Sequence, residues 1–284
     1  MTPLMAIIGD SFVEARQVEN KQTMHGILSS LYRPKCGVYS FGASGAPLSQ
    51  YLAYAEYAQK EFRPSRFVFI IVGNDFDESL VKYRGRHAFH YFSETSNDLS
   101  KKIELKLIDY QPQKTAIALR ESALYRYLSL NLGIKQLLKI RKRYSTEAQK
   151  RMYAGNALAL VEDERMNDSH FVVKTFFKQL PMRTGLSPKD ILFILDGIRP
   201  HLYSNRELKA ANGSYFSLMR KFFMKYAGSK GYEVIDMQPI FMANYQQNGM
   251  RFEFPNDGHW NELGHQVVAD SIHRSTAISR SSCS

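Results

Sequence analysis

Short apolar runs that alternate with helix-like stretches constrain the fold of this chain more than any other feature. The runs span residues 4–8, 38–41, 67–72, 191–195 and 232–235. They are too short for buried helices, so we predict that they are buried strands. Stretches with helical spacing lie between them or close the chain, at residues 49–62, 206–226 and 261–272. This alternation predicts an α/β fold in which a parallel sheet is covered on both faces.

Three residues that could take part in catalysis come soon after predicted strands. Ser11 follows the first run, Gly45 follows the second and Asn74 follows the third. The carboxyl ends of parallel strands meet at one edge of a sheet, and ligand sites of such folds lie there. We therefore expect these three residues to face a common site.

The interval between the third and fourth runs, residues 76–190, is too long for one crossover helix. Its centre, residues 115–144, has helical character and mixes leucines with basic residues: Leu128, Leu132, Leu137, Leu138, Lys135, Lys139, Arg141, Lys142 and Arg143. Charge runs are usually solvated faces, and we favour that interpretation over a surface that contacts an anionic polymer or a membrane. We expect a single domain over residues 1–284, with a helical cap or side lobe at about residues 76–185.

The chain carries an excess of positive charge. The formal net charge is +11, which favours contact with anions such as acidic glycans, nucleic acid or membrane surfaces. No zinc-finger, RRM or basic-zipper pattern accompanies it, so we expect no nucleic-acid partner. The sequence shows neither a membrane-spanning apolar run nor a signal peptide, which leaves a cytoplasmic location or secretion with the leader removed. It gives no indication of the oligomeric state.

Serine becomes a nucleophile when a base takes its proton, and histidine is the best base near neutral pH. Among the eight histidines, His259 has the most informative surroundings. Asp257, two residues earlier, can accept its Nδ1–H and fix the tautomer. Trp260 could wall the pocket, and Asn261 can cap the helix that follows. Taken alone, His259 would be interpreted as a hydrogen-bonded loop histidine, but the residues at the strand ends favour a base.

Attack on an ester creates an oxyanion, which needs hydrogen-bond donors aimed at it. The Ser11 N–H lies at a strand-to-helix turn and gains from the helix N-terminus. Gly45 can offer its N–H because no side chain blocks the approach. Asn74 can offer an amide that carries no titratable charge. Each residue alone is more often a turn residue, and their common order at strand ends favours an oxyanion hole.

Four segments together resemble the blocks of the SGNH hydrolases, also called GDSL esterases. They are Ile7-Ile8-Gly9-Asp10-Ser11, Phe41-Gly42-Ala43-Ser44-Gly45, Val72-Gly73-Asn74-Asp75, and Asp257-Gly258-His259 with Gly264-His265 beyond it. The resemblance covers about residues 4–80 and 186–275. It implies a three-layer α/β/α sandwich with a flavodoxin-like five-stranded parallel sheet, and a site without a metal or an organic cofactor.

The resemblance also assigns roles to residues of this chain. It implies Ser11 as nucleophile, His259 as base and Asp257 as orienting carboxylate. The oxyanion donors would be the N–H of Ser11, the N–H of Gly45 and the amide of Asn74, with Gly42 as the other possibility for the glycine.

Three positions depart from the usual motifs of the family. Phe12 replaces the leucine of Gly-Asp-Ser-Leu, and Val72 replaces the first glycine of the third block. The usual Asp–His spacing is three, and Asn256 stands at that position here, which leaves Asp257 at a spacing of two. Some members of the family work with a Ser–His dyad, so the importance of Asp257 stays open.

The expected activity is hydrolysis of small acyl esters, with O-acetylated carbohydrates as the first substrate class and lipid esters as the second. An O-acyltransferase that acts on a glycan would use the same residues. A third alternative is a module without catalysis that binds anions through the basic insertion, and the presence of all four catalytic residue types disfavours it.

Overall fold

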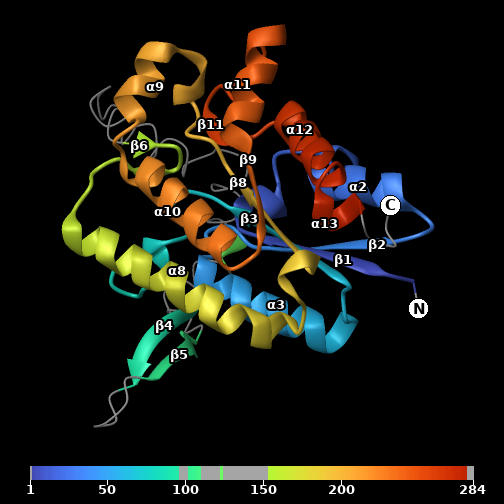
Figure 1. Cartoon of the computed structure of the whole chain (residues 1–284), viewed down its shortest axis with the longest axis vertical. Coiled ribbons are helices and arrows are strands. Elements are labelled where there is room, and N and C mark those ends of the chain that lie inside the picture. The colour runs from blue at the N-terminus through green and yellow to red at the C-terminus, as the bar shows by residue number, and fades with distance from the viewer. Residues whose placement is uncertain (1, 96–101, 110–121, 124–152, 280–284) are drawn as a thin grey trace.

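The centre of the computed structural model, which describes residues 2–95, 102–109, 122–123 and 153–279, is a sheet of five parallel strands (Figure 1). The strands are β1 (Leu4–Gly9), β2 (Gly37–Gly42), β3 (Arg66–Ile71), β8 (Ile191–Leu195) and β9 (Glu233–Asp236). Their order in the sheet is β2-β1-β3-β8-β9, and every neighbouring pair is parallel. All five coincide with the predicted apolar runs, so the prediction of a parallel α/β sheet is confirmed.

Alternate side chains of each strand enter two separate hydrophobic clusters, as the two-residue period of a strand requires. On β1, Ala6 and Ile8 point to one cluster, while Met5 and Ile7 point to the other. The strands therefore read as continuous apolar runs because both of their faces are buried.

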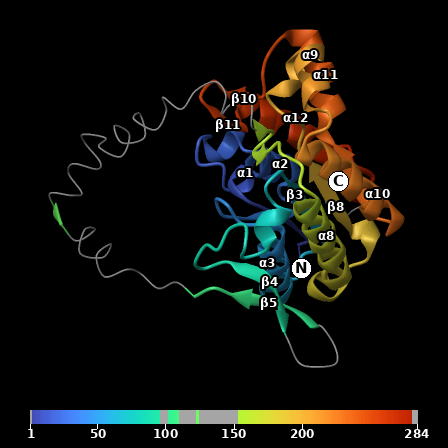
Figure 2. The ribbon, with the colours of Figure 1, turned by 90° about the vertical axis from the view of Figure 1, so that its left-hand side faces the viewer.

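Helices cover both faces of the sheet and complete three layers (Figures 1 and 2). The helices α3 (Leu48–Phe62), α8 (Asp163–Thr184) and α10 (Tyr215–Ser229) contribute to the first cluster. The helices α1 (Ser11–Glu14), α2 (Met24–Tyr32), α11 (Met237–Asn248), α12 (Glu262–His273) and α13 (Thr276–Ser279) contribute to the second. The predicted α/β/α sandwich is thus confirmed.

Two helices begin and end close to the residues expected from the sequence, whereas a third prediction was wrong. The stretch 206–226 forms two helices, α9 (Asn205–Ala211) and α10, because Gly213 and Ser214 interrupt it. The Ser214 side chain accepts from the Ser217 N–H, which starts the second helix with its own cap. Ahead of α12, the Asn261 side chain accepts from the Gly264 N–H, as predicted.

The interval after β3 contains more strands than expected. Its described elements are the turn η2 (Asp77–Ser79), the hairpin of β4 (His90–Thr95) and β5 (Lys102–Leu107), the short hairpin of β6 (Tyr153–Ala154) and β7 (Ala157–Leu158), and α8. The helix α8 lies in the outer layer and packs against α3 and α10. The predicted basic helix at residues 115–144 falls almost wholly outside the described residues, so its contact with an anionic polymer or membrane stays a prediction.

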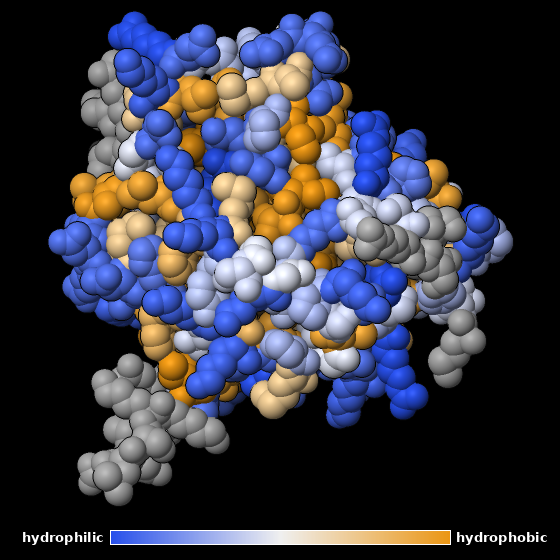
Figure 3. All heavy atoms as spheres, viewed as in Figure 1, coloured by the Kyte–Doolittle hydropathy of each residue, from blue (hydrophilic) through white to orange (hydrophobic). Residues whose placement is uncertain are grey.

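The remaining elements are the turns η1 (Asn20–Gln22), η3 (Pro188–Asp190) and η4 (His201–Tyr203), and the hairpin of β10 (Glu253–Phe254) and β11 (Asp257–Trp260). Hydrophilic residues cover the outer parts of the face seen in Figure 3, and hydrophobic residues show mainly near its middle. Within the described ranges, no helix has the combination of length and apolar character that crossing a membrane requires.

Replacing Phe193 by alanine tests the aromatic core. The Phe193 ring is fully buried, with its centroid 5.3 Å from those of Phe69 and Phe223. We expect Phe193→Ala to lower the free energy of unfolding by about 3–5 kcal/mol, because it leaves a cavity between the sheet and α10. Urea unfolding followed by circular dichroism measures this loss.

The matched control is Met182→Ala, because the Met182 side chain on α8 is 76% exposed. We expect it to change the free energy of unfolding by less than about 0.5 kcal/mol. Equal effects of the two substitutions would contradict the described core.

Candidate active site

The carboxyl ends of β1, β2, β3 and β8 border an open cleft with a volume of about 1790 Å³. Every residue predicted from the sequence for the site lines this cleft: Ser11, Gly45, Asn74, Asp257 and His259. Trp260 does not belong to the lining. It is buried behind the cleft, where its ring packs edge-on against Phe12 with centroids 5.0 Å apart.

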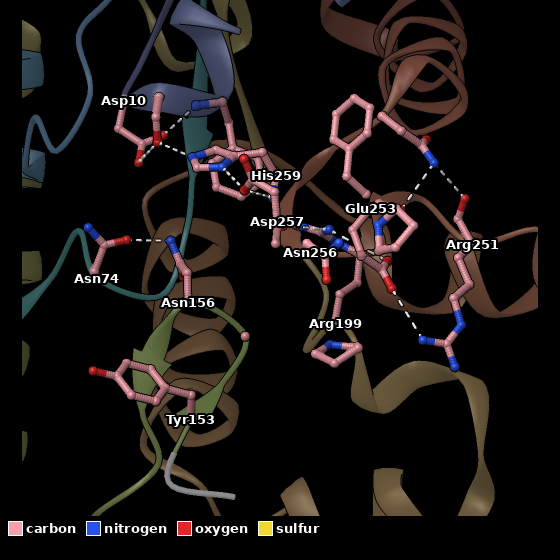
Figure 4. Close-up of a pocket in the computed structure, with 18 of the residues that line it drawn as sticks. Asp10, Asn74, Tyr153, Asn156, Arg199, Arg251, Glu253, Asn256, Asp257 and His259 are labelled. Carbon is pink, nitrogen blue, oxygen red and sulfur yellow. Dashed lines mark hydrogen bonds and ion pairs between the residues drawn. The ribbon is translucent and has the colours of Figure 1, made fainter. Parts of the chain in front are cut away.

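Ser11, His259 and Asp257 form a continuous chain of hydrogen bonds. The Ser11 Oγ lies 2.7 Å from the His259 Nε2, although 248 residues separate the two in the sequence. On the other side of the ring, the His259 Nδ1 is bonded to the Asp257 Oδ1 (Figure 4). An ionised carboxylate only accepts, so the proton lies on Nδ1 and the lone pair of Nε2 faces the serine.

Several bonds fix Asp257 as the acceptor for the ring. The His259 N–H donates to its Oδ1 at 3.1 Å, and the Gln17 Nε2 donates to its Oδ2 at 3.1 Å. Partial burial alone would raise the pKa of Asp257, but the hydrogen bonds from His259 and Gln17 outweigh burial and lower it. The carboxylate is therefore ionised wherever His259 can act as a base.

The hairpin of β10 and β11 holds His259 over the end of β1. Arg199 reaches into this hairpin from the end of β8, and its Nη1 donates to the Gly258 carbonyl at 3.0 Å. Its Nη2 is 2.6 Å from the Asp196 Oδ2, and both of these side chains are buried. The Phe12 ring packs against the His259 imidazole, with ring centroids 4.9 Å apart.

Asp10 is a buried acid beside the candidate nucleophile. Its Oδ1 accepts from the Phe12 N–H at 2.9 Å and caps α1, and its Oδ2 lies 3.1 Å from the Ser11 Oγ. Burial raises the pKa of Asp10 to about 6, although the bond from Phe12 and the proximity of His259 act against this rise. Ser11 thus contacts an imidazole nitrogen whose lone pair faces its hydroxyl, and a carboxyl group that becomes neutral in mild acid.

Gly45 and Asn74 face the cleft from the ends of β2 and β3. Gly45 has φ +77°, a left-handed conformation that favours glycine. The Asn74 Nδ2 donates to the Glu78 Oε2 at 3.1 Å, which leaves its second N–H for the cleft. The two glycines proposed as alternatives differ in position, because Gly42 packs against Val13 whereas Gly45 lines the cleft.

Asn156, in the turn between β6 and β7, fixes the orientation of the Asn74 amide. Its Oδ1 accepts from the Gly73 N–H at 2.7 Å, and its Nδ2 donates to the Asn74 Oδ1 (Figure 4). A backbone N–H can only donate, so the Asn156 amide has a single orientation. That orientation makes the Asn74 oxygen an acceptor and turns its nitrogen toward Glu78 and the cleft.

Asn156 and Arg199 were not predicted from the sequence. Arg199 follows the predicted strand at residues 191–195, and the rule that located Ser11 and Asn74 could have found it. Asn156 follows a glycine in the insertion at about residues 76–185, and no sequence pattern connects it to Asn74. In the parts of the chain that the structure describes, no group of three or more His, Cys, Asp or Glu side chains is arranged to hold a metal ion.

No protein-family model and no curated protein matches this sequence. Among solved structures, the chain is similar to a member of the lipolytic G-D-S-L family from Veillonella parvula, with 12% identity, TM-score 0.47 and coverage of 96% of this chain and 98% of the other. It is also similar to LAE5, an alpha/beta hydrolase enzyme from the metagenome of Lake Arreo, with 15% identity, TM-score 0.49 and coverage of 98% and 97%.

A two-domain esterase active on acetylated mannans is similar too, with 11% identity, TM-score 0.46 and coverage of 95% of this chain but 47% of the esterase. Several of the similar structures thus bear the name of the family that the four motifs resemble. At such identities a shared name carries no substrate with it, and the chemistry follows from the side chains of this chain.

Replacing Asp10 by asparagine tests the buried acid. The pKa of Asp10 is raised from 3.8 to about 6. Ionisation of Asp10 therefore destabilises the folded state, by an amount that grows as the pH rises from about 4 to about 6. Asparagine keeps the acceptor for Phe12 and carries no charge. We expect Asp10→Asn to be more stable than wild type by on the order of 1–3 kcal/mol at about pH 8, with a much smaller difference at about pH 4.

Urea unfolding of both proteins at the two pH values measures this difference. A gain of equal size at both pH values would show that the charge of Asp10 is not its cause.

Proposed function

We propose that this protein is a serine ester hydrolase of the SGNH type. The Ser11 Oγ attacks the acyl carbon of an ester while the His259 Nε2 takes the serine proton. The tetrahedral oxyanion then receives hydrogen bonds from the Ser11 N–H, the Gly45 N–H and the Asn74 amide. Collapse of this intermediate breaks the ester bond, and the proton on His259 goes to the leaving alkoxide.

The second half of the reaction repeats these roles with water. His259 takes a proton from a water molecule, whose oxygen attacks the acyl-enzyme. The oxyanion forms at the same place, and its collapse releases the carboxylic acid and returns the proton to Ser11. Asp257 accepts the Nδ1–H throughout and stabilises the imidazolium that forms in both halves.

The observation that carries this proposal is the chain of hydrogen bonds from Ser11 through His259 to Asp257, which joins the two ends of the sequence. The 2.7 Å separation of the Ser11 Oγ and the His259 Nε2 is the hydrogen bond that proton transfer needs. The bond from the His259 Nδ1 to Asp257 selects the tautomer that can accept. An imidazole lone pair directed at a serine hydroxyl is the arrangement that a serine nucleophile and its general base require.

The proposed substrates are small acyl esters, with O-acetylated carbohydrates first among them. The cleft is open, and the residues that line it include many charged and amide side chains. Such walls suit an alcohol portion that is itself rich in hydroxyl groups.

Ser11→Ala and His259→Ala are each expected to lower kcat/KM for 4-nitrophenyl acetate by at least about 10³-fold, because each removes one end of the proton-transfer pair. Asp257→Ala should lower it by less, since the imidazole keeps its position against Phe12. A fluorophosphonate probe should label wild-type protein at Ser11, as identified by peptide mapping.

Matched controls are Ser271→Ala and His87→Ala, which replace the same residue types outside the cleft lining. Wild-type activity in Ser11→Ala or His259→Ala would refute the site. An unchanged rate in Asp257→Ala would assign a dyad.

Asn156 gives a separate test of the oxyanion hole. We expect Asn156→Ala to lower kcat with little change in KM, because Asn74 loses the bond that fixes its amide. The loss should be smaller than the roughly 10²- to 10³-fold expected when an oxyanion donor itself is removed.

Asn156→Asp separates orientation from packing. Aspartate has nearly the same shape, but it offers no N–H to the Asn74 Oδ1 and would favour the reversed Asn74 amide. We therefore expect its kcat to fall at least as far as that of Asn156→Ala. Wild-type kcat in Asn156→Asp would contradict the orienting role.

A further inference from the structure

Two arginines border the part of the cleft that holds Gly45 and Asn74. Arg84 and Arg86 come from the segment between η2 and β4, and both line the cleft together with Ser11. The motifs recognised in the sequence include neither of them. Their position brings positive charge close to the place where the acyl carbonyl would lie.

Arg86 lies directly over Gly45. Its Nη1 donates to the Ser44 carbonyl at 3.0 Å. A Cβ atom added at Gly45 would come within 2.2 Å of the same nitrogen. The guanidinium therefore occupies the space that a side chain at this position would need, immediately beside a proposed oxyanion donor.

Arg86 differs from the other arginines of the cleft because no carboxylate of the described residues faces its charge. Four arginines belong to the lining, and three of them face carboxylates. These pairs are Arg84 with Glu78, Arg199 with Asp196, and Arg251 with Glu253. Arg86 takes part in none of the ion pairs found among the described residues, and the hydrogen bond that its side chain makes with them goes to a neutral carbonyl.

An arginine at the edge of a cleft that pairs with no carboxylate of the described residues is suited to bind one from a ligand. The guanidinium presents five N–H donors in a fixed plane, and the bond to Ser44 uses one of them. Carboxylates match this geometry and can accept two parallel hydrogen bonds. Arg86 is also exposed, so a ligand can reach it from the solvent.

We propose that Arg86 is the anion-binding residue of this cleft and that the protein prefers esters that carry a carboxylate near the reacting carbonyl. The inference rests on the proposed esterase function and names its substrate class. The carboxylate belongs to the acyl part or to the alcohol part of the ester, and substrates of both kinds distinguish these two sources.

The test compares acidic and neutral esters of matched size. 4-Nitrophenyl hemisuccinate and 4-nitrophenyl butyrate form the acyl-side pair, and 4-acetoxybenzoate and 4-acetoxybenzamide form the alcohol-side pair. We expect wild type to favour the acidic member of at least one pair. Arg86→Gln should lower that preference in kcat/KM about tenfold, as for loss of a charge-assisted hydrogen bond, and Arg86→Lys should retain part of it.

The control for net charge is Lys60→Gln, because Lys60 lies at the far end of α3 and outside the cleft lining. It removes the same charge and should leave the preference unchanged. If Arg86→Gln keeps the wild-type preference in both pairs, or wild type has none, the proposal is overturned while the esterase function stands.

A binding measurement keeps the proposal testable without catalysis. Succinamate and butyramide are amides that resemble the acyl-side pair, and calorimetry with Ser11→Ala protein avoids turnover. Measurable affinity for succinamate alone, lost on adding Arg86→Gln, supports the anion site even if no ester is hydrolysed. Equal affinities for succinamate in both backgrounds, or none in either, together with no acidic preference in the alcohol-side pair, contradict it.

Discussion

The buried pair of Asp196 and Arg199 connects the sheet to the hairpin that carries His259. The carboxylate accepts from two nitrogens of Arg199 and from the Trp260 Nε1 at 3.1 Å, while Arg199 also holds the Gly258 carbonyl. Burying two charges is costly, and such a pair is weak evidence for stability. Its evident effect here is position, because it sets the two residues on either side of His259 against the end of β8.

Two parts of the candidate site, one around His259 and one around Asn74, each contain a group that can act only as an acceptor or only as a donor. An ionised Asp257 can only accept, which assigns the proton to the His259 Nδ1. The Gly73 N–H can only donate, which assigns the Asn156 amide and through it the Asn74 amide. In each case the group that would touch the substrate is oriented before the substrate arrives, so little reorganisation remains for the transition state.

The sequence predicted those features that depend on nearby residues. Apolar runs revealed all five strands of the sheet, and Ser11, Gly45 and Asn74 could be placed because each follows a strand. Arg199 could have been placed by the same rule, but its bond to Gly258, 59 residues away, could not. Asn156 acts through a partner that is 82 residues away, and no local pattern encodes such a pairing. The two-residue strand β10 was missed for the same reason, since it exists only through its pairing with β11. The break between α9 and α10 was encoded locally by Gly213 and Ser214, but the flanking helical spacing concealed it.

Two carboxyl groups near Ser11 have pKa values that are shifted in opposite directions. Burial raises the pKa of Asp10 to about 6, whereas for Asp257 the hydrogen bonds outweigh burial and lower the pKa. As the pH falls, Asp10 takes up a proton first, and Asp257 still accepts from His259. A protonated Asp10 can donate to the Ser11 Oγ instead of accepting from it. Asp257 orients the base because its Oδ1 is bonded to the His259 Nδ1, whereas the Asp10 carboxyl group is bonded to the Phe12 N–H and the Ser11 hydroxyl.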